Sequence, residues 1–262
     1  MPIIHTTSQL VSPAGRISLD PYDALGSLTG QIEFGHVPSA TVSIEQDKNE
    51  EYSGESASRE LIGTLYGRIN RTMQIVCRNL SMDNYKRFLS ATGSVKVQTA
   101  TPVVDELRDV LPGRNYQLGQ TAANPFGVRG VSSVSVKSEV GSTAYVVGVD
   151  YNVDLAAGII QILEGGAITA GKVKFGYTPV AGSYTQLETG ANASFRAAIV
   201  VRADNASGEN NDWYMPLCEI SASGDLPLVS NELDYVEITF SVAILKPANG
   251  QAIYVGGRPV VV

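Results

Sequence analysis

The strongest constraint on the fold of this chain is an alternation of apolar and polar side chains with a period of two. In residues 235–244, apolar side chains occupy every second position. Residues 28–36, 39–45 and 70–78 show the same alternation. Because successive side chains of a β-strand point to opposite faces of its sheet, each stretch predicts a strand with one buried and one hydrated face. We therefore predict an all-β fold.

Helical patterning is scarce in this sequence. Residues 82–90 carry aromatic and apolar side chains at helical spacing, and Ser81 in front of them is a suitable N-cap. We expect one short helix there. The stretch 105–110 could add a short helical turn, and the remainder is typical of strands and loops.

Two stretches interrupt the strand pattern. Residues 46–67 are polar and too long for a hairpin turn, and loops of this length in compact domains are usually functional or disordered. Residues 113–185 contain strand-like segments and turns of their own, so we expect a β-rich insert whose role the sequence does not show. The expected organisation is a core formed by 1–112 and 186–262, with the insert between them and a long loop within the core.

Composition excludes several classes of protein. The 262 residues carry a net charge of −7, which argues against wrapping nucleic acid, because that task needs a basic surface. Cys77 and Cys218 are the only cysteines, so the chain is no disulfide scaffold. No apolar run approaches the roughly 18 residues that span a membrane, and the N-terminus lacks the regions of a signal peptide. We expect folding in the cytoplasm and no membrane association.

Residues suited to catalysis or metal binding are few. The sequence has two histidines, and no metal-ligand cluster or activated nucleophile is apparent. Gly166–Lys172 has the spacing of a phosphate-binding loop, but Val173 follows where the motif needs Ser or Thr, and the next residues alternate as in a strand. Asp150 and Asp154 are better explained as turn residues than as an acid–base pair. We predict no enzyme activity, no catalytic residue, no metal site and no cofactor.

Charge is unevenly distributed along the first third of the chain. Residues 31–60 contain seven acidic and two basic side chains, a net charge of −5, whereas residues 68–87 have a net charge of +4. One interpretation is two solvated faces that happen to differ. The other is an acidic segment that docks on a basic segment of another copy.

Three stretches occur in an order similar to that of a known family. Residues 26–28 enter the first strand pair and lead to an acidic loop rich in Tyr, Ser and Gly at 51–56. A strand then runs into 82–85, similar to the family's short helix after its third strand. Residues 195–208 and 215–218 then precede a long closing strand, in an order of apolar strand, Asn/Gly turn, Pro and final strand. Together these stretches resemble the major tail protein, or tail tube protein, family of long-tailed bacteriophages.

The resemblance implies a β-sandwich subunit that forms hexameric rings. The rings stack into a tube through the long loop at 46–67, and each subunit lends strands to an inner β-barrel. Implied partners are other copies of the chain, a tape-measure protein and other tail proteins, with DNA only as transiting cargo. The implied location is the tail of the virion, after assembly in the host cytoplasm.

The hydrated faces of the predicted strands suit the wall of a DNA conduit. Lysine or arginine there would bind phosphates and stall DNA, and none of these faces carries a basic residue. The predicted lumen-lining residues are Gln31, Glu33, Thr41, Ser43, Glu45, Thr72, Gln74, Glu237, Thr239 and Ser241.

The acidic loop and the basic segment after it supply the predicted contacts between rings. The acidic side chains would dock on the basic ones of the next ring. The predicted contact residues are Glu50, Glu51, Tyr52, Glu55, Arg59, Glu60, Arg68, Arg71 and Arg78.

An alternative is another virion or surface β-protein, such as a tail-tip, decoration or carbohydrate-binding module. Its support is the 12 tyrosines, Trp213 beside three polar residues at 210–212, and the insert, which would be an outward-facing binding domain. We prefer to interpret Trp213 and Tyr214 as an aromatic pair in a core or a subunit interface.

Overall fold

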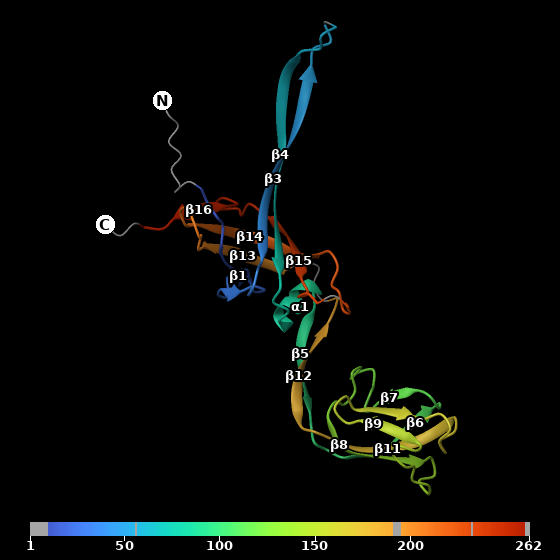
Figure 1. The fold of residues 1–262 in the computed structure, drawn as a ribbon. Coiled ribbons are helices and arrows are strands. Elements are labelled where there is room, and N and C mark those ends of the chain that lie inside the picture. The colour runs from blue at the N-terminus through green and yellow to red at the C-terminus, as the bar shows by residue number, and fades with distance from the viewer. Residues whose placement is uncertain (1–9, 56, 191–194, 232, 260–262) are drawn as a thin grey trace. The chain divides into compact units, whose positions relative to one another are not determined.

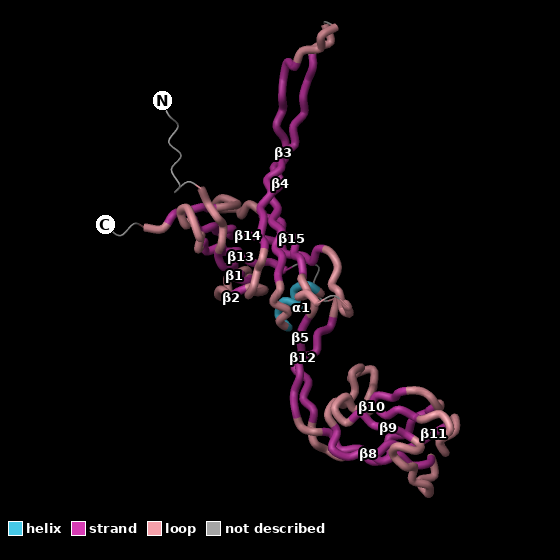
Figure 2. Tube along the Cα trace, in the orientation of Figure 1, coloured by secondary structure: helices cyan, strands magenta, loops and turns pink. Residues whose placement is uncertain are grey.

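The structure is a computed structural model of the 262-residue chain (Figures 1 and 2). It describes residues 10–55, 57–190, 195–231 and 233–259. Strands dominate these residues, and α1 is the single helix among them. The prediction of an all-β fold with one short helix is confirmed.

The chain divides into two compact units. Unit 1 consists of 1–93 and 187–262, and unit 2 consists of 94–186. The elements of unit 1 are β1 (Gly15–Pro21), β2 (Ile32–Glu33), β3 (Ser39–Tyr52), β4 (Leu61–Cys77), α1 (Met82–Phe88), β13 (Phe195–Ala203), β14 (Asn211–Ser223), β15 (Ile238–Ile244) and β16 (Tyr254–Gly257).

Eight strands of unit 1 form one antiparallel sheet in the order β2-β1-β13-β14-β15-β4-β3, with β16 added beside β14. The long strand β14 pairs with β16 through residues 211–214 and with β15 through residues 218–223. Its neighbour β13 has a register shift between Ala197 and Ile199. Long strands that change partners near a bulge form the corners of β-packings, so β13 and β14 join the two halves of this sheet.

The core of unit 1 confirms the predicted strand faces within 70–77 and 238–244, whereas 235–237 precede β15 and every residue of 39–45 is exposed, so the buried face predicted for 39–45 is wrong. Alternate side chains of the two confirmed stretches are buried, and the polar residues between them are not. The buried set comprises Met73, Ile75, Cys77, Ile238, Phe240, Val242 and Ile244.

Helix α1 packs onto this core where the sequence predicts it. The Ser81 hydroxyl accepts a hydrogen bond from the Asn84 N–H at 3.2 Å, as expected of an N-cap. The Phe88 ring meets the Phe240 ring edge to face, with 6.1 Å between centroids. Asn84 is buried, and its side-chain amide donates to the carbonyl oxygens of Phe34 (3.0 Å) and Asn79 (2.7 Å).

The stretch 28–36, predicted as a full strand, contains only the two residues of β2. Gly30 and Gly35 have φ angles of 110° and 87°, a region that side chains with a Cβ rarely adopt. The Asp20 carboxylate accepts the N–H of Gly30 at 2.7 Å, which holds the bent path. These turns interrupt the alternation, and β2 pairs with β1 instead of a neighbouring long strand.

The stretch 46–67 was wrongly expected to be a long loop, because most of it belongs to β3 and β4. The two strands pair from Ser39↔Val76 to Tyr52↔Leu61, with the turn confined to residues 53–60. Strand β15 pairs with β4 only as far as Thr72. Beyond that point the hairpin continues as a two-stranded ribbon, residues 44–71, which we call the arm (Figure 1). Strands pair through backbone hydrogen bonds, which polar residues form as well as apolar ones. The polar composition of 46–67 therefore did not reveal that these residues are paired.

Unit 2 has a core of its own between two three-stranded sheets. One sheet has the order β6-β11-β8 and the other β7-β10-β9. The strands are β6 (Val103–Val110), β7 (Asn115–Gln117), β8 (Val131–Ser138), β9 (Tyr151–Asp154), β10 (Ile159–Ile162) and β11 (Gly171–Pro179). Val136, Ile160 and Phe175 are among its buried side chains.

The insert begins earlier than predicted, at residue 94 instead of 113, and its end at 186 lies beside the predicted one. The reason is β6, which occupies the stretch expected to form a helical turn and pairs with β11. Charged residues occupy half-buried positions of β6, so the sequence lacks the apolar–polar alternation of a strand. Glu106 binds Arg108 at 2.8 Å and accepts a hydrogen bond from the Tyr177 hydroxyl at 2.6 Å. A ribbon of β5 (Thr92–Gln98) and β12 (Gly182–Glu188) carries the chain into and out of unit 2.

Replacing Asn84 with alanine tests how α1 is held. Asn84→Ala removes the short hydrogen bonds to the carbonyl oxygens of Phe34 and Asn79, which keep only contacts of 3.5–3.6 Å. Loss of the partner of a buried polar group costs about 1–3 kcal/mol. We expect a loss of about 2 kcal/mol or more in the free energy of unfolding, measured by urea denaturation. The exposed Asn49→Ala is the matched control, and equal losses in both variants would contradict this role.

Candidate functional site

A polar face spans the neighbouring strands β14, β15, β4 and β3. Thr41 lies opposite Gln74, and Ser43 lies opposite Thr72. Ser241 of β15 flanks Gln74 on its other side. With Ser223 these side chains line one shallow hollow, to which Met73, whose side chain is buried in the core, also contributes, and we call this surface the polar face. The structure therefore brings together the predicted residues Thr41, Ser43, Thr72, Gln74 and Ser241.

Ser223 and Ser221 of β14 belong to the same surface and were missed in the sequence. Ser221 lies opposite Ser241, and its hydroxyl meets the Ser241 carbonyl oxygen at 3.3 Å. The signal was present, because both serines alternate with the buried Ile220. Further along, Arg196 and Glu219 lie opposite each other, and both the Nε and Nη2 of Arg196 donate to one Glu219 oxygen. The charge of Arg196 is thus paired with a carboxylate.

Gln31 and Glu33 do not join the polar face. Glu33 lies on β2, at the far end of the sheet order from β3. Its carboxylate is 3.8 Å from Arg16, and Gln31 accepts a hydrogen bond from Arg202 at 2.6 Å. Gln31 precedes β2, and β2, which holds Glu33, pairs with β1; the alternation within residues 28–36 carried no information about that partner.

Three further predicted lining residues lie around the polar face. Thr239 sits in β15 opposite Val76, on the side of Gln74 away from the arm. Glu45 lies opposite Asn70, at the base of the arm beyond the last residue that β15 reaches. Glu237 precedes β15 and forms an ion pair with Arg78 at 2.6 Å.

The predicted acidic contact residues lie along the arm and at its tip. Glu50 is held by its own strand, since its carboxylate accepts from Lys48 at 2.6 Å and from Tyr52 at 2.7 Å. These two hydrogen bonds lower the pKa of Glu50. Glu51 lies opposite Gly63 and is exposed.

The described residues of the arm tip are 53–55 and 57–60. The Ser53 N–H donates to the Glu60 carbonyl oxygen at 2.7 Å and closes the turn. Arg59 has a φ of 42°, which helps the chain reverse. Within the described residues, the carboxylates of Glu55 and Glu60 have no ion pair or hydrogen bond, so both are available to a partner.

The predicted basic contact residues do not form a separate shelf. Arg68 lies on β4 within the arm itself, and Arg71 lies opposite Ile44 at its base. Arg78 is engaged by Glu237. The acidic and basic segments thus share one hairpin, because the loop expected between them is a pair of strands.

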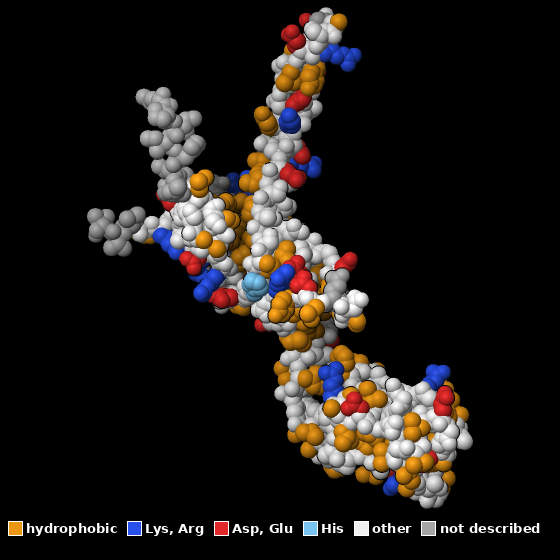
Figure 3. All heavy atoms as spheres, in the orientation of Figure 1, with side chains coloured by type: hydrophobic (Ala, Val, Ile, Leu, Met, Phe, Trp, Pro, Cys, Tyr) orange, Lys and Arg blue, Asp and Glu red, His pale blue; other side chains and the backbone are white. Residues whose placement is uncertain are grey.

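The arm also exposes large apolar side chains. Figure 3 shows them among its acidic and basic groups. Leu65 and Tyr66 are 74% and 69% exposed. The full set on β4 of the arm is Leu61, Ile62, Leu65, Tyr66 and Ile69. Leu65 and Tyr66 are neighbours in the strand, so these apolar side chains lie on both faces of the ribbon. Exposed apolar groups on a projecting ribbon are typical of a surface that binds another protein.

The aromatic pair Trp213 and Tyr214 lies on β14. Both side chains are 37% exposed, and the Tyr214 ring is 6.2 Å from that of Tyr254 between centroids. The pair is therefore exposed at a strand surface and lies outside the core of the sheet, so a core position is wrong for it.

Asp150 and Asp154 organise turns in unit 2, as predicted. The Asp150 carboxylate accepts the N–H groups of Val146 at 2.8 Å and Ala167 at 2.7 Å, and these bonds lower its pKa. Asp154 accepts the N–H of Ala157 at 2.9 Å. Ala167 belongs to the Gly-rich stretch that mimics a phosphate-binding loop, which here leads into β11.

Two other kinds of site are absent from the described residues. No group of three or more His, Cys, Asp or Glu is placed to hold a metal ion in the part of the chain that the structure describes. Within the described residues, no helix is long and apolar enough to cross a membrane.

Comparison with protein families gives a match over most of the chain. Residues 10–251 match the family described as protein of unknown function UCP028589. Because the match extends over most of the sequence, the chain belongs to this family. The curated proteins contain no match.

The pKa of Asp150 predicts how stability depends on pH. Its pKa in the folded protein is lowered, so its contribution is present above the pKa of the unfolded chain and is lost as pH falls through the folded value. Asp150→Asn should therefore destabilise the protein at pH 7, and the deficit should shrink towards pH 3. Urea denaturation followed by circular dichroism at both pH values measures this. A deficit that stays constant would be inconsistent with the two backbone bonds, and Asp154→Asn should show a smaller one at pH 7.

Proposed function

We propose that this chain is the structural subunit of a phage tail tube, which assembles into stacked hexameric rings and forms the conduit for genome delivery into the host. The observation that carries the proposal is the polar face. Its hollow is lined by hydroxyl and amide side chains together with Met73, and none of the described residues that line it is basic.

A wall of this chemistry suits the passage of DNA. Each phosphate that meets a lysine or arginine releases counterions and gains affinity, which would slow a moving duplex. Serine, threonine and glutamine side chains keep a hydrated surface without a positive charge. The nearby Arg196 is paired with Glu219, so its charge is largely compensated.

Edges of the sheet support assembly into a larger structure. Among the described residues, β3 pairs only with β4, so its other edge is free along 14 residues. Long free edges invite pairing with another chain, and closure of a ring removes them. The exposed apolar side chains of the arm provide a second surface for contact between copies.

The proposed partners follow from this role. Copies of the chain associate with one another, with a tape-measure protein and with other tail proteins, and DNA is only transiting cargo. The subunit assembles in the host cytoplasm and resides in the tail of the virion. Its work is mechanical, with no catalytic step.

Electron microscopy of the purified protein at rising concentration tests the proposal. We expect hexameric rings and short tubes, with mass photometry giving six subunits in a ring. Compact monomers under every condition of concentration and ionic strength would refute it.

A second candidate is a tail-tip, decoration or carbohydrate-binding protein, which one observation in unit 2 favours. Asn115, Gln161 and Asn152 lie side by side across β7, β10 and β9, all exposed, and line a shallow groove. Amide side chains in a row can hydrogen-bond sugar hydroxyls. Specific binding on a glycan array, lost in Gln161→Ala, would favour this candidate.

Polar substitution in the arm should prevent assembly without unfolding the subunit. Leu65→Ser with Tyr66→Ser removes two exposed apolar side chains that lie outside the core. We expect fewer rings and tubes by sedimentation velocity and an unchanged melting temperature. Leu228→Ser, at a side chain 87% exposed outside the arm, is the control. Equal assembly of the two variants would argue against a role for the arm.

Basic substitution on the polar face should make the tube retain DNA. Thr72→Lys with Gln74→Lys places two new positive charges per subunit in the hollow, where both residues are exposed. We expect assembly to persist and short duplex DNA to cosediment with the variant tubes at low salt, with release as salt rises. Gln161→Lys in unit 2 is the control. Equal retention by variant and control tubes would mean that the polar face does not border the bore.

A further inference from the structure

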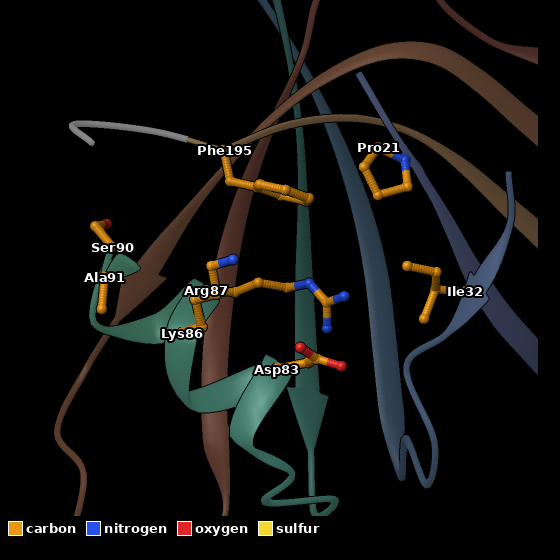
Figure 4. Close-up of a pocket in the computed structure, with 8 residues that line it drawn as sticks. All are labelled: Pro21, Ile32, Asp83, Lys86, Arg87, Ser90, Ala91 and Phe195. Carbon is orange, nitrogen blue, oxygen red and sulfur yellow. The ribbon is translucent and has the colours of Figure 1, made fainter. Parts of the chain in front are cut away.

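A pocket beside α1 holds an arginine that the proposed tube wall and arm do not use. Its apolar wall is formed by Pro21, Ile32 and Phe195, and its charged wall by Asp83, Lys86 and Arg87 of α1 (Figure 4). Its volume is ≈ 250 Å³. All six residues belong to unit 1.

Arg87 is buried, with 9% of its surface exposed. Its guanidinium carbon lies 6.0 Å from the centroid of the Phe34 ring and 5.7 Å from that of Phe195. One nitrogen, Nη1, donates to the side-chain oxygen of Asn84 at 2.6 Å. Burial lowers the pKa of Arg87, and the nearby charge of Asp83 partly opposes that effect.

The hydrogen-bonding capacity of this guanidinium is mostly unused. Arginine has five N–H donors, and among the described residues only Asn84 accepts from Arg87. No described carboxylate forms an ion pair with Arg87, and Figure 4 shows its guanidinium end reaching into the pocket above Asp83. Burying a charge without an ionic partner is costly, and a carboxylate would receive two parallel N–H bonds from this group. With Lys86 and Asp83 beside it, the pocket has a net positive charge and fits one additional carboxylate.

The acidic tip of the arm supplies carboxylates of the required kind. Glu55 and Glu60 have no partner among the described residues, whereas Glu50 is held by its own strand. Three basic residues were predicted to receive the glutamates of the tip. Arg68 and Arg71 lie on the arm itself, and Arg78 is paired with Glu237. The Arg87 pocket is therefore the better complement to the tip.

The two features lie at opposite ends of one strand. The tip adjoins Leu61, the first residue of β4, and α1 follows Cys77, its last residue (Figure 1). A strand of 17 residues, at roughly 3.3 Å per residue, separates them by about 50 Å. The tip of one copy cannot reach its own pocket, and contact with the pocket of another copy is head to tail. Such heterologous contacts form a closed ring or an open filament, depending on the rotation between successive copies.

We propose that the Arg87 pocket receives a glutamate carboxylate, Glu55 or Glu60, from the arm tip of a second copy of this chain. This inference rests on the self-assembly in the proposed function and adds the site at which successive copies engage.

Peptide binding to the full-length protein tests the site without any assembly. The probe is a blocked, fluorescent peptide of residues 50–62, and its control carries Gln at positions 55 and 60. We expect the probe to bind the wild-type protein at least tenfold more tightly than the control peptide, and Arg87→Gln to abolish the difference. Equal binding of both peptides, or no binding of either, overturns the proposal.

Two further measurements distinguish a second copy of the chain from a free carboxylate as the ligand of the pocket. Ile32→Trp narrows the pocket without changing Arg87 and should also weaken peptide binding, so the test survives if Arg87→Gln fails to fold. Acetate is the small-molecule probe, followed through the Nε resonance of Arg87. If acetate shifts that resonance and the peptide does not displace the acetate, the pocket binds a free small carboxylate. That result refutes the proposal that a second copy supplies the carboxylate.

Zero-length cross-linking of assembled protein provides the matching structural result. In a mixture of ¹⁴N- and ¹⁵N-labelled protein, carbodiimide should join Lys86 of one copy to Glu55 or Glu60 of another, as mixed-isotope peptides. Links at Lys172 but none at Lys86 would contradict docking. Tubes without peptide binding or this link overturn the inference alone, whereas binding without tubes leaves the site standing and refutes the tail-tube function.

Discussion

The backbone ladder between β3 and β4 is the interaction on which the two candidate surfaces depend. In its register Val42 lies opposite Met73, on the core side, and Ser43 lies opposite Thr72, on the polar face. A shift of one residue would exchange the two faces of β3. The buried side chains of β4 and β15 fix this register at one end, and the arm continues the same ladder beyond the sheet. The arm and the β3–β4 part of the polar face therefore belong to one continuous hairpin, and β15 and β14 complete the polar face.

Part of this architecture could be predicted because its signals are local. The alternation in 70–78 and 235–244 assigned each side chain to a face, and Ser81 marked the start of α1. The grouping of Thr72, Gln74 and Ser241 followed from face assignment, since neighbouring antiparallel strands place polar positions side by side.

The errors arose where structure depends on a distant partner or on backbone geometry. Residues 46–52 are a strand because β4 lies beside them, and their polar composition is that of a loop. Gly30 and Gly35 break a stretch whose side chains still alternate. In β6, Glu106 and Arg108 are half-buried because they bind each other and Tyr177, a contact between residues far apart in the sequence. None of these partners is visible in a local pattern.

The paired strands β5 and β12 mark unit 2 as an insertion into unit 1. Because the two strands are paired, the chain leaves unit 1 and returns to it at adjacent points, about 5 Å apart across the ladder. Unit 2 has its own core, so its folding depends on few residues elsewhere. A short turn between the two strands would close unit 1 without it. Unit 2 is thus an inserted domain that another domain can replace, in evolution or by design. The sheet, the arm and the Arg87 pocket of unit 1 would stay unchanged.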